Sequence, residues 1–271
     1  MKKKILSIVL ASTLVIGAIS LVGCGAKKEA GTETKKKIVV GATPKPHAEI
    51  LKKVQPILEK EGYTLEIKEF TDYVTPNTAV QDGELDANFF QHIPYLEQFN
   101  KEKNTDLDYT AKVHLEPMAV YSNKIKDLKE LKDGATIAVP NDPTNEARAL
   151  RLLEKEGIMK FKEGELISKL DIIENTKNIK IEELDAAQLP RTLDEVDAAV
   201  INTNYAIAAG LNPTKDALAI ESKESPYVNV IAVKRENKDK DYIKALDKAL
   251  NSEEIRKFIE EEYKGSIIPA F

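Results

Sequence analysis

Arg148 is the residue of this chain whose type and position most directly suggest chemistry. It lies in the segment 145–150, in the first turns of a helix that is predicted to follow a strand. A guanidinium fork near the free N–H groups and the positive end of a helix suits a carboxylate. An exposed ion pair with Glu146 is the alternative that the spacing alone leaves open.

Several asparagines fall at predicted strand ends or loop starts. An amide side chain offers a donor and an acceptor without net charge, so it suits both the ammonium and the carboxylate of one small zwitterion. Turn formation and capping are commoner uses of asparagine, and they stay open at each position. The asparagines concerned are Asn145, Asn202, Asn204 and Asn229.

Aromatic residues gather in one short segment of a chain that has no tryptophan and only 6% aromatic residues. Phe89, Phe90, His92 and Tyr95 follow one another closely, with Tyr73 upstream. Aromatic rings make favourable contacts with sulfur, so this cluster suits the wall of a pocket for a thioether. Core packing is the alternative, although Phe89 and Phe90 are adjacent in a predicted strand and therefore point to opposite faces.

The sequence carries no signature of a catalytic or metal-binding protein. His47, His92 and His114 share no close metal-ligand spacing, and no Gly-rich phosphate loop or Gly-x-Ser-x-Gly motif occurs. The net charge of −5 argues against a nucleic-acid partner. We therefore predict a protein that is not an enzyme and uses no metal and no cofactor. A peptide hydrolase with a scattered triad and an adhesive surface lipoprotein are the alternatives from other classes.

Apolar periodicity divides the chain after residue 37 into alternating strands and helices, the signature of a layered α/β fold. In the first part we predict strands at 38–42, 63–70, 86–90, 109–113 and 118–121, with helices at 48–60, 76–83 and 94–103. A second part starts near Ser122. There we predict strands at 135–139, 170–173, 179–181, 197–201 and 227–233, with helices at 127–131, 142–157, 186–192, 203–209, 239–250 and 253–263.

Two α/β units side by side form a cleft, and ligands of such sheets bind at the carboxyl ends of the strands. The segments 88–92, 141–148, 202–205 and 227–229 are predicted to lie there. A short similarity also relates 83–90 to 193–202, since each has an apolar residue, Asp and Ala entering a buried strand. An internal repeat and chance similarity of two turns are both compatible with so short a match.

The N-terminus has the pattern of an export signal. A basic start at Lys2–Lys4 precedes an apolar run, and Leu21-Val22-Gly23-Cys24 matches the bacterial lipobox. The alternative, an uncleaved spanning helix, is disfavoured by the lipobox at the end of the run. We predict a signal peptide at 1–23, lipid on Cys24 and a flexible tether at 24–37. Stable anchoring needs more than one acyl chain, so diacyl and triacyl forms are both open.

Several motifs occur in an order that resembles one known family. They are the segments 41–44, 46–50, 86–92, 139–145 with Arg148, and 224–229. Together they resemble the NlpA/MetQ lipoproteins, the methionine-binding components of bacterial ABC importers, over the chain from about Lys37 to its end. The resemblance implies a two-lobed periplasmic-binding-protein fold of type 2, with the ligand in the cleft between the lobes. Lobe 1 would comprise 38–121 and 222–271, and lobe 2 would comprise 122–221.

The resemblance also implies a role for individual residues. Arg148 would hold the ligand carboxylate with Asn145 beside it, and Asn202 and Asn229 would contact the amino and carboxylate groups. The side chains expected around the thioether are Tyr73, Phe89, His92 and Tyr95. Glu116 matches a family segment and would line the site. The family pattern leaves open whether Asn202, Asn204 or both reach the ligand.

The expected function is capture of L-methionine outside the membrane and its delivery to a permease driven by an ATPase. A methionine-containing dipeptide, D-methionine or another small apolar amino acid remains an alternative ligand. The protein would be anchored to the cell membrane by lipid and would face away from the cytoplasm. The oligomeric state is left open by the sequence.

Overall fold

The computed structural model describes residues 36–271. The predicted signal peptide at 1–23, the lipid acceptor Cys24 and the tether as far as residue 35 lie outside these described residues. The predicted tether extends to residue 37, but Lys37 already begins the first strand, where it pairs with Thr64. Within the described part, no helix has the length and apolar character needed to cross a membrane.

The first sheet combines strands from the two ends of the described chain. Its order is β13-β4-β12-β3-β1-β2. Strand β1 is parallel to β2 and β3, whereas β12 runs antiparallel to β3 and β4. The strands are β1 (Lys37–Ala42), β2 (Thr64–Glu69), β3 (Ala87–His92), β4 (Leu107–Leu115), β12 (Val228–Lys234) and β13 (Ile268–Pro269).

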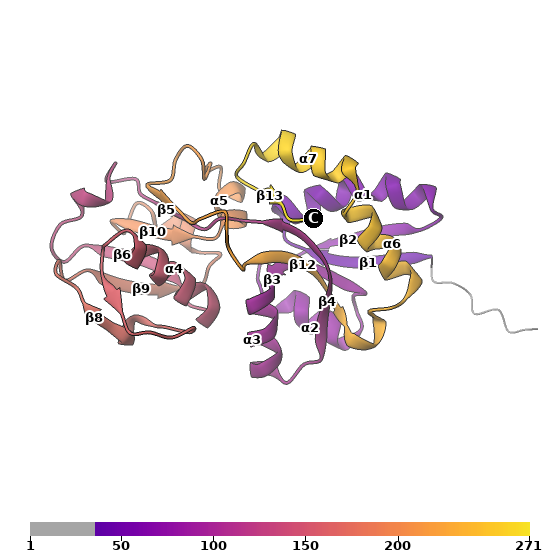
Figure 1. The fold of residues 1–271 in the computed structure, drawn as a ribbon, viewed down its shortest axis with the longest axis horizontal. Helices are drawn as coiled ribbons and strands as arrows, with labels where there is room; N and C mark the ends of the chain where they lie inside the picture. Colours follow the sequence, from indigo (N-terminus) through magenta and orange to yellow (C-terminus); the bar gives the residue numbers. More distant parts are fainter. Residues whose placement is uncertain (1–35) are drawn as a thin grey trace, which may run out of the picture. The chain divides into compact units, whose positions relative to one another are not determined.

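Helices cover both faces of this sheet, because its strands are apolar on both sides. Ile38 and Val40 of β1 share a core with α1 (Glu49–Lys60), α6 (Asp241–Leu250) and α7 (Glu253–Tyr263). Val39, which points to the opposite face, packs against the core that includes α2 (Thr75–Asp82) and α3 (Ile93–Lys103). Figure 1 shows the two groups of helices, and we call this sheet with its helices lobe 1.

The second sheet has the order β11-β5-β10-β6-β9. Ile137 and Val200 face α4 (Pro143–Lys155), whereas Ala138 and Ile201 face α5 (Thr203–Ala208) and the short 3₁₀ helix η4 (Leu189–Thr192). We call this sheet with its helices lobe 2. Its strands are β5 (Ala119–Tyr121), β6 (Thr136–Pro140), β9 (Lys180–Leu184), β10 (Ala198–Ile201) and β11 (Ala219–Ile220).

The predicted two-lobed α/β architecture is confirmed, with one boundary corrected. The chain passes from lobe 1 to lobe 2 between β4 and β5, and it returns between β11 and β12. We call residues 116–118 the first crossing and residues 221–227 the second crossing. The predicted boundary at 121 placed β5 in lobe 1, but β5 pairs with β10 and β11. Lobe 2 therefore begins about three residues earlier, because a three-residue strand shows no preference for either sheet until its partners are known.

The similarity between 83–90 and 193–202 corresponds to one hydrogen-bond arrangement that occurs in both lobes. The carboxylate of Asp86 accepts the N–H of Val39 at 2.8 Å, and the carboxylate of Asp197 accepts the N–H of Thr136 at 2.8 Å. Each Asp precedes the strand that enters its sheet and ties that strand to the parallel neighbour. The shared motif therefore has a structural role in each lobe.

Most predicted elements are present within one to three residues of their expected ends. The segment 186–192 was predicted as a helix but forms only η4, with Pro190 in its first turn. The strand predicted at 170–173 is shorter, since η3 (Lys169–Asp171) precedes β8 (Ile172–Glu174). Two-residue strands β7 (Lys160–Phe161), β11 and β13 have no sequence signal of their own.

Candidate ligand-binding site

A pocket lies where the two crossings meet the ends of strands from both lobes. It encloses about 320 Å³ of empty space, part of it open to solvent. Every predicted site residue except Phe89 and the lipid acceptor lines it, so the fold brings together nine side chains spread over more than 150 positions. The lining comprises Tyr73, Phe90, Gln91, His92, Tyr95, Glu116, Asn145, Arg148, Asn202, Thr203, Asn204 and Asn229.

The placement of Phe89 differs from its prediction. Phe89 is fully buried in the core of lobe 1, where its ring meets those of His47 and His114 edge-on at 4.6 and 5.3 Å between centroids. The next residue, Phe90, faces the other way and lines the pocket. Successive strand residues point to opposite faces. The sequence therefore shows that the pair is divided, but not which member faces the ligand side.

Arg148 lies in the second turn of α4 and is only 4% exposed. Helix α4 begins at Pro143, and the carboxylate of Asp142 caps it by accepting the N–H of Asn145 at 3.0 Å. The guanidinium lies over the ring of Tyr227, with 4.3 Å from its carbon to the ring centroid. This burial excludes the exposed ion pair with Glu146, the alternative that the sequence left open.

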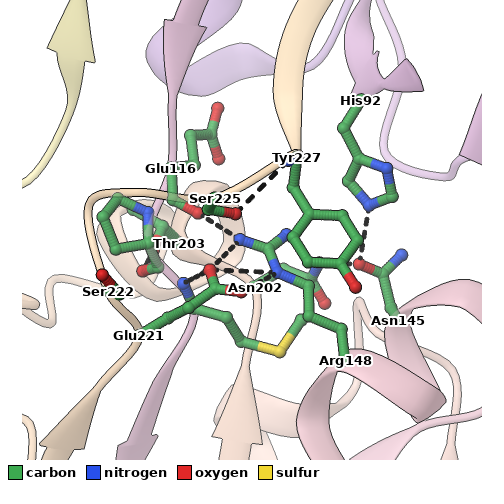
Figure 2. Close-up of polar contacts among 12 residues, drawn as sticks. His92, Glu116, Asn145, Arg148, Asn202, Thr203, Glu221, Ser222, Ser225 and Tyr227 are labelled. Carbon is green, nitrogen blue, oxygen red and sulfur yellow. Dashed lines mark hydrogen bonds and ion pairs between the residues drawn. The ribbon is translucent and has the colours of Figure 1, made fainter. Parts of the chain in front are cut away.

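The guanidinium of Arg148 connects helix α4 to both crossings (Figure 2). One terminal nitrogen, Nη2, donates to the carbonyl oxygen of Glu116 at 2.7 Å in the first crossing. Its Nε and Nη2 edge meets the carboxylate of Glu221 in the second crossing, with Nε at 3.0 and 3.1 Å from the two oxygens. Among residues 36–271, no hydrogen bond uses Nη1, so the donors on Nη1 are available for a ligand.

Asn145 uses its whole side chain in contacts within the protein. Its Nδ2 donates to both oxygens of Asp142 at 3.0 and 2.9 Å. Its Oδ1 accepts from Nδ2 of Asn202 at 2.9 Å and lies 3.1 Å from Nε2 of His92. Because Nδ1 of His92 accepts the N–H of Tyr95, Nε2 carries the proton and donates to Asn145. Asn145 therefore joins lobe 2 to lobe 1 (Figure 2).

His92 makes this contact as a neutral ring. Burial, and then the nearby charge of Arg148, lower the pKa of His92 to about 3. The imidazole is therefore uncharged at neutral pH and offers a single N–H to Asn145.

Asn202 and Asn204 each leave one buried polar atom without a partner among the described residues. On Asn202 it is the acceptor Oδ1, since Nδ2 donates to Asn145. On Asn204 it is the donor Nδ2, since Oδ1 accepts the hydroxyl of Tyr73 at 2.6 Å. Buried polar groups are nearly always hydrogen-bonded, so an orphaned acceptor and an orphaned donor in one pocket indicate room for a polar ligand.

An aromatic wall closes another side of the pocket. The ring centroid of Tyr73 lies 5.6 Å from that of Phe90 and 5.8 Å from that of Tyr95. The hydroxyl of Tyr95 donates to the carbonyl of Tyr73 at 3.0 Å, and this hydrogen bond fixes the position of the Tyr95 ring beside Tyr73. The pocket therefore has one polar end and one aromatic end.

Asn229 reaches the pocket for a reason other than the predicted one. It stands at the beginning of β12, not at a carboxyl end, but β12 runs antiparallel to its neighbours. Its register partners are His92 on β3 and His114 on β4, both near the carboxyl ends of those strands. The beginning of β12 therefore lies at the same edge of the sheet.

A buried group of His47, His114 and Glu116 lies beside Asn229. One ligand-type atom from each of the three residues lies within 4.8 Å of the others, the kind of grouping that can hold a metal ion. Sequence spacing does not reveal this group, because 67 residues separate the two histidines. In the structure Nε2 of His114 and Nε2 of His47 lie 2.7 and 3.1 Å from one oxygen of Glu116, which are hydrogen-bond distances.

Sequence reasoning did not single out Gln91, Thr203 or Glu221. Gln91 belongs to a buried amide network with Asn77 and Asn88, and its strand position was the available signal. Thr203 ties α5 to the carbonyl of Pro117 in the first crossing. Glu221 lies in a polar segment with no distinguishing pattern, so only the fold identifies it.

Comparison with known proteins agrees with this geometry. The family model described as NlpA lipoprotein matches residues 38–271. The D-methionine-binding lipoprotein MetQ of Salmonella typhi is 45% identical over 258 residues, which cover 94% of each chain.

Solved structures are similar over nearly the whole described chain. A nutrient-binding protein from Burkholderia cenocepacia bound to methionine is 50% identical with a TM-score of 0.85, over 86% of this chain and all of that one. A periplasmic substrate-binding protein of an ABC transporter from Coxiella burnetii is 44% identical with a TM-score of 0.83, over 86% of this chain and all of that one. The two lobes described above therefore have the fold of periplasmic substrate-binding proteins.

Proposed function

The chain belongs to the NlpA lipoprotein family, and on this premise we propose that it captures L-methionine for an ABC importer. The role is binding and delivery, without a catalytic step. The ligand would occupy the pocket between the lobes, with its carboxylate toward Arg148 and its side chain toward the aromatic wall.

One observation carries this proposal furthest. The orphaned acceptor of Asn202 and the orphaned donor of Asn204 share a pocket with the buried cation of Arg148 and the buried carboxylate of Glu116. An α-amino acid presents an ammonium, which needs acceptors, and a carboxylate, which needs donors. The two open amide atoms therefore match the two halves of a zwitterion, and both Asn202 and Asn204 would contact it.

The aromatic end suits the side chain of methionine. Tyr73, Phe90, His92 and Tyr95 would surround the thioether, since sulfur contacts with ring edges are favourable by about 0.3–1.5 kcal/mol each. Phe90 takes the role that the family pattern suggested for Phe89. Asn229 and Asn145 would complete the site, Asn145 by holding the lobes together.

The family also suggests the proteins and the membrane with which this chain acts. We propose that the protein delivers its ligand to a membrane permease driven by an ATPase. Lipid on Cys24 and the tether that follows it would hold the protein at the outer side of the cell membrane. Lobe 1 would comprise 37–118 and 222–271, and lobe 2 would comprise 119–221. A tethered body of this kind could close on its ligand near the permease.

Thermal unfolding of a refolded, ligand-free sample tests the ligand. At a concentration about 100 times its dissociation constant, L-methionine should add about 2.7 kcal/mol to stability, whereas leucine and glutamate should add much less. D-Methionine and a methionine-containing dipeptide belong in the same series. A shift with either of them but none with L-methionine would replace the ligand, and no shift with any amino acid or peptide would reject the proposal.

A further inference from the structure

Tyr205 connects the two lobes from outside the ligand pocket. It follows the pocket residue Asn204 on α5 of lobe 2, but it does not itself line the pocket. Its hydroxyl donates to the carbonyl oxygen of Thr71 in lobe 1 at 3.0 Å. Its ring lies against the ring of Tyr73 in lobe 1, with 5.0 Å between the centroids and 33° between the planes. Tyr205 therefore binds lobe 1 through both its hydroxyl and its ring.

Two successive residues of α5 hold the same short segment of lobe 1, residues 71–73, which we call the latch segment. Oδ1 of Asn204 accepts the hydroxyl of Tyr73 at 2.6 Å, and the next residue, Tyr205, holds the carbonyl of Thr71. On this side of the pocket the lobes therefore meet through one segment and one helix.

The latch segment is fixed to the rest of lobe 1 by its own contacts. The carbonyl of Tyr73 accepts the hydroxyl of Tyr95 at 3.0 Å. The carboxylate of Asp72 accepts the N–H groups of Val74 and Thr75 at 2.8 and 2.7 Å, at the start of α2. Because all these contacts lie within lobe 1, we expect the latch segment to move with lobe 1 when the lobes separate.

The two paired rings stand between the ligand pocket and an outer groove. Tyr73 lines the pocket, whereas Tyr205 lines a groove of about 1110 Å³ that is partly open to solvent. Residues of both lobes line this groove, among them Asp72 of lobe 1 with Asp185 and Arg191 of lobe 2. A ligand that leaves the pocket on this side must therefore first part the two rings.

Both phenols act as donors at neutral pH. Burial raises the pKa of Tyr73 and that of Tyr205, and the carboxylates of Asp185 and Asp72 raise the pKa of Tyr205 further. The hydroxyls therefore stay protonated, and both hydrogen bonds between the lobes are available over the physiological pH range.

The contacts of Tyr205 with lobe 1 last only while the lobes are together, because they run from one lobe to the other. A neutral hydrogen bond contributes modestly to stability, and an aromatic pair contributes a similar amount beyond its buried area. A ligand enters while the lobes are apart. Contacts that form after closure therefore slow its release without changing its rate of entry.

We propose that Tyr205 is a positioning residue that retains the ligand by fastening the latch segment of lobe 1 to α5 of lobe 2. The inference rests on the proposed function and adds to it a residue that does not touch the ligand. Tyr205 determines how long the ligand stays bound, and it does not determine which amino acid is chosen.

The rate of ligand release tests this role in the refolded full chain. Release of radiolabelled L-methionine is followed after a chase with unlabelled ligand, and calorimetry gives the dissociation constant, so the two together give the rate of association. Tyr205→Phe removes only the hydroxyl and should release L-methionine about 3- to 10-fold faster. Tyr205→Leu also removes the ring and should release it roughly 10- to 100-fold faster. Association should stay within about twofold of wild type in both variants.

Two controls accompany these variants. Tyr63 packs against the core of lobe 1 away from the pocket, so Tyr63→Phe should release L-methionine at the wild-type rate. L-Norleucine, which has a methylene in place of the sulfur, should be released faster by the same factors as L-methionine, because Tyr205 does not contact the ligand. Circular dichroism confirms that each variant is folded, and Tyr205→Phe keeps the test valid if Tyr205→Leu is not.

Three results would overturn the inference. They are wild-type release rates in both Tyr205 variants, a change in association in place of release, and faster release of L-methionine but not of L-norleucine. The second would mean a structural role only, and the third would assign Tyr205 to the aromatic wall. The wild-type protein alone tests the proposed function. If it binds another amino acid, the same rates are measured with that ligand, and if it binds no amino acid, both proposals are rejected.

Discussion

The carboxylate of Glu221 occupies the Nε edge of the Arg148 guanidinium, with Nε at 3.0 and 3.1 Å from its two oxygens. Glu221 is in the second crossing, and Arg148 also donates to the carbonyl of Glu116 in the first. One buried side chain thus fixes helix α4 to both segments that join the lobes. The fork that the sequence assigned to a ligand carboxylate is mostly used within the protein, so the proposed ligand carboxylate would have to meet the Nη1 side.

This arrangement predicts a double effect for Arg148→Ala. Removing the guanidinium leaves Glu221 partly buried without its cation, so the free energy of unfolding should fall by about 3–5 kcal/mol. Affinity for L-methionine should fall by about 2–5 kcal/mol. Arg148→Lys should behave similarly, because one ammonium cannot reach both crossings and the ligand. Urea unfolding and calorimetry measure the two effects, and near-wild-type affinity in both variants would place the carboxylate site elsewhere.

Glu221→Gln separates the two roles of Arg148. The amide keeps an acceptor for the guanidinium but removes the charge that competes with the ligand carboxylate. Stability should fall by roughly 1–3 kcal/mol, while L-methionine affinity should stay within about threefold of wild type or increase. A loss of affinity as large as that of Arg148→Ala would contradict the assignment of Glu221 to the crossing alone.

Phe89 and Phe90 form a matched pair for a third prediction. Phe90→Leu removes an aromatic contact from the pocket and should weaken L-methionine binding up to about tenfold, as expected for lost sulfur–ring contacts. Phe89→Leu alters only the core of lobe 1, so it should lower stability by roughly 1 kcal/mol and leave affinity unchanged. Calorimetry on both variants measures the difference, and the reverse pattern would show that Phe89 faces the ligand.

The sequence predicted most of the fold because its signals are local. Short, continuous apolar runs mark β1 and β6, and a helix-capping pattern marks α4, without any information about partners. The position of β5 was mistaken because three residues pair with whichever sheet is nearest. Asn229 was placed correctly for an incorrect reason, since only the antiparallel direction of β12 brings its beginning to the edge of the pocket.

Contacts over long sequence distances were beyond local reasoning. Arg148 and Glu221 are 73 residues apart, and an ordinary-looking Glu in a polar segment gives no sign of burial against an Arg. His47 lies just before α1 and Glu116 lies 69 residues later in the first crossing, and only the fold brings their side chains within 3.1 Å. Residue type and predicted position singled out Arg148 and the asparagines, and the family resemblance suggested their roles. Neither could show that the side chain of Asn145 is fully used within the protein.

Asp247 on α6 predicts a pH dependence of stability. Its carboxylate accepts the hydroxyl of Thr110 at 2.8 Å, and burial raises its pKa to about 6. An unfolded Asp has a pKa of about 3.9, so between these values the folded state binds more protons and stability falls as pH rises. Asp247→Asn should therefore raise the free energy of unfolding by roughly 1–3 kcal/mol at pH 7, and the gain should vanish below about pH 4. Urea unfolding at both pH values measures it, and a gain independent of pH would exclude the titration of Asp247.

The proposed lipid anchor is tested at Cys24. Cys24→Ala removes the thiol that would accept the lipid, so the protein should lose labelling by radioactive palmitate and leave the membrane fraction or remain unprocessed. Lys27→Ala, in the predicted tether just beyond the lipobox, is the matched control and should behave like wild type. A Cys24→Ala protein that fractionates and migrates like wild type would exclude lipidation at this residue.

The last prediction concerns Asn145, whose amide joins His92 of lobe 1 to Asn202 and Asp142 of lobe 2. Because all its bonding atoms are used within the protein, we expect Asn145 to act on closure of the lobes and not on one group of the ligand. Asn145→Ala should weaken L-methionine and L-methioninamide by the same factor, roughly 10-fold or more, since it leaves several buried polar groups unpaired. Arg148→Ala is the contrasting control and should weaken L-methionine more than the amide, which lacks the carboxylate charge. Calorimetry with the two ligands decides the point, and a loss for Asn145→Ala that depends on the carboxylate would show that Asn145 touches the ligand directly.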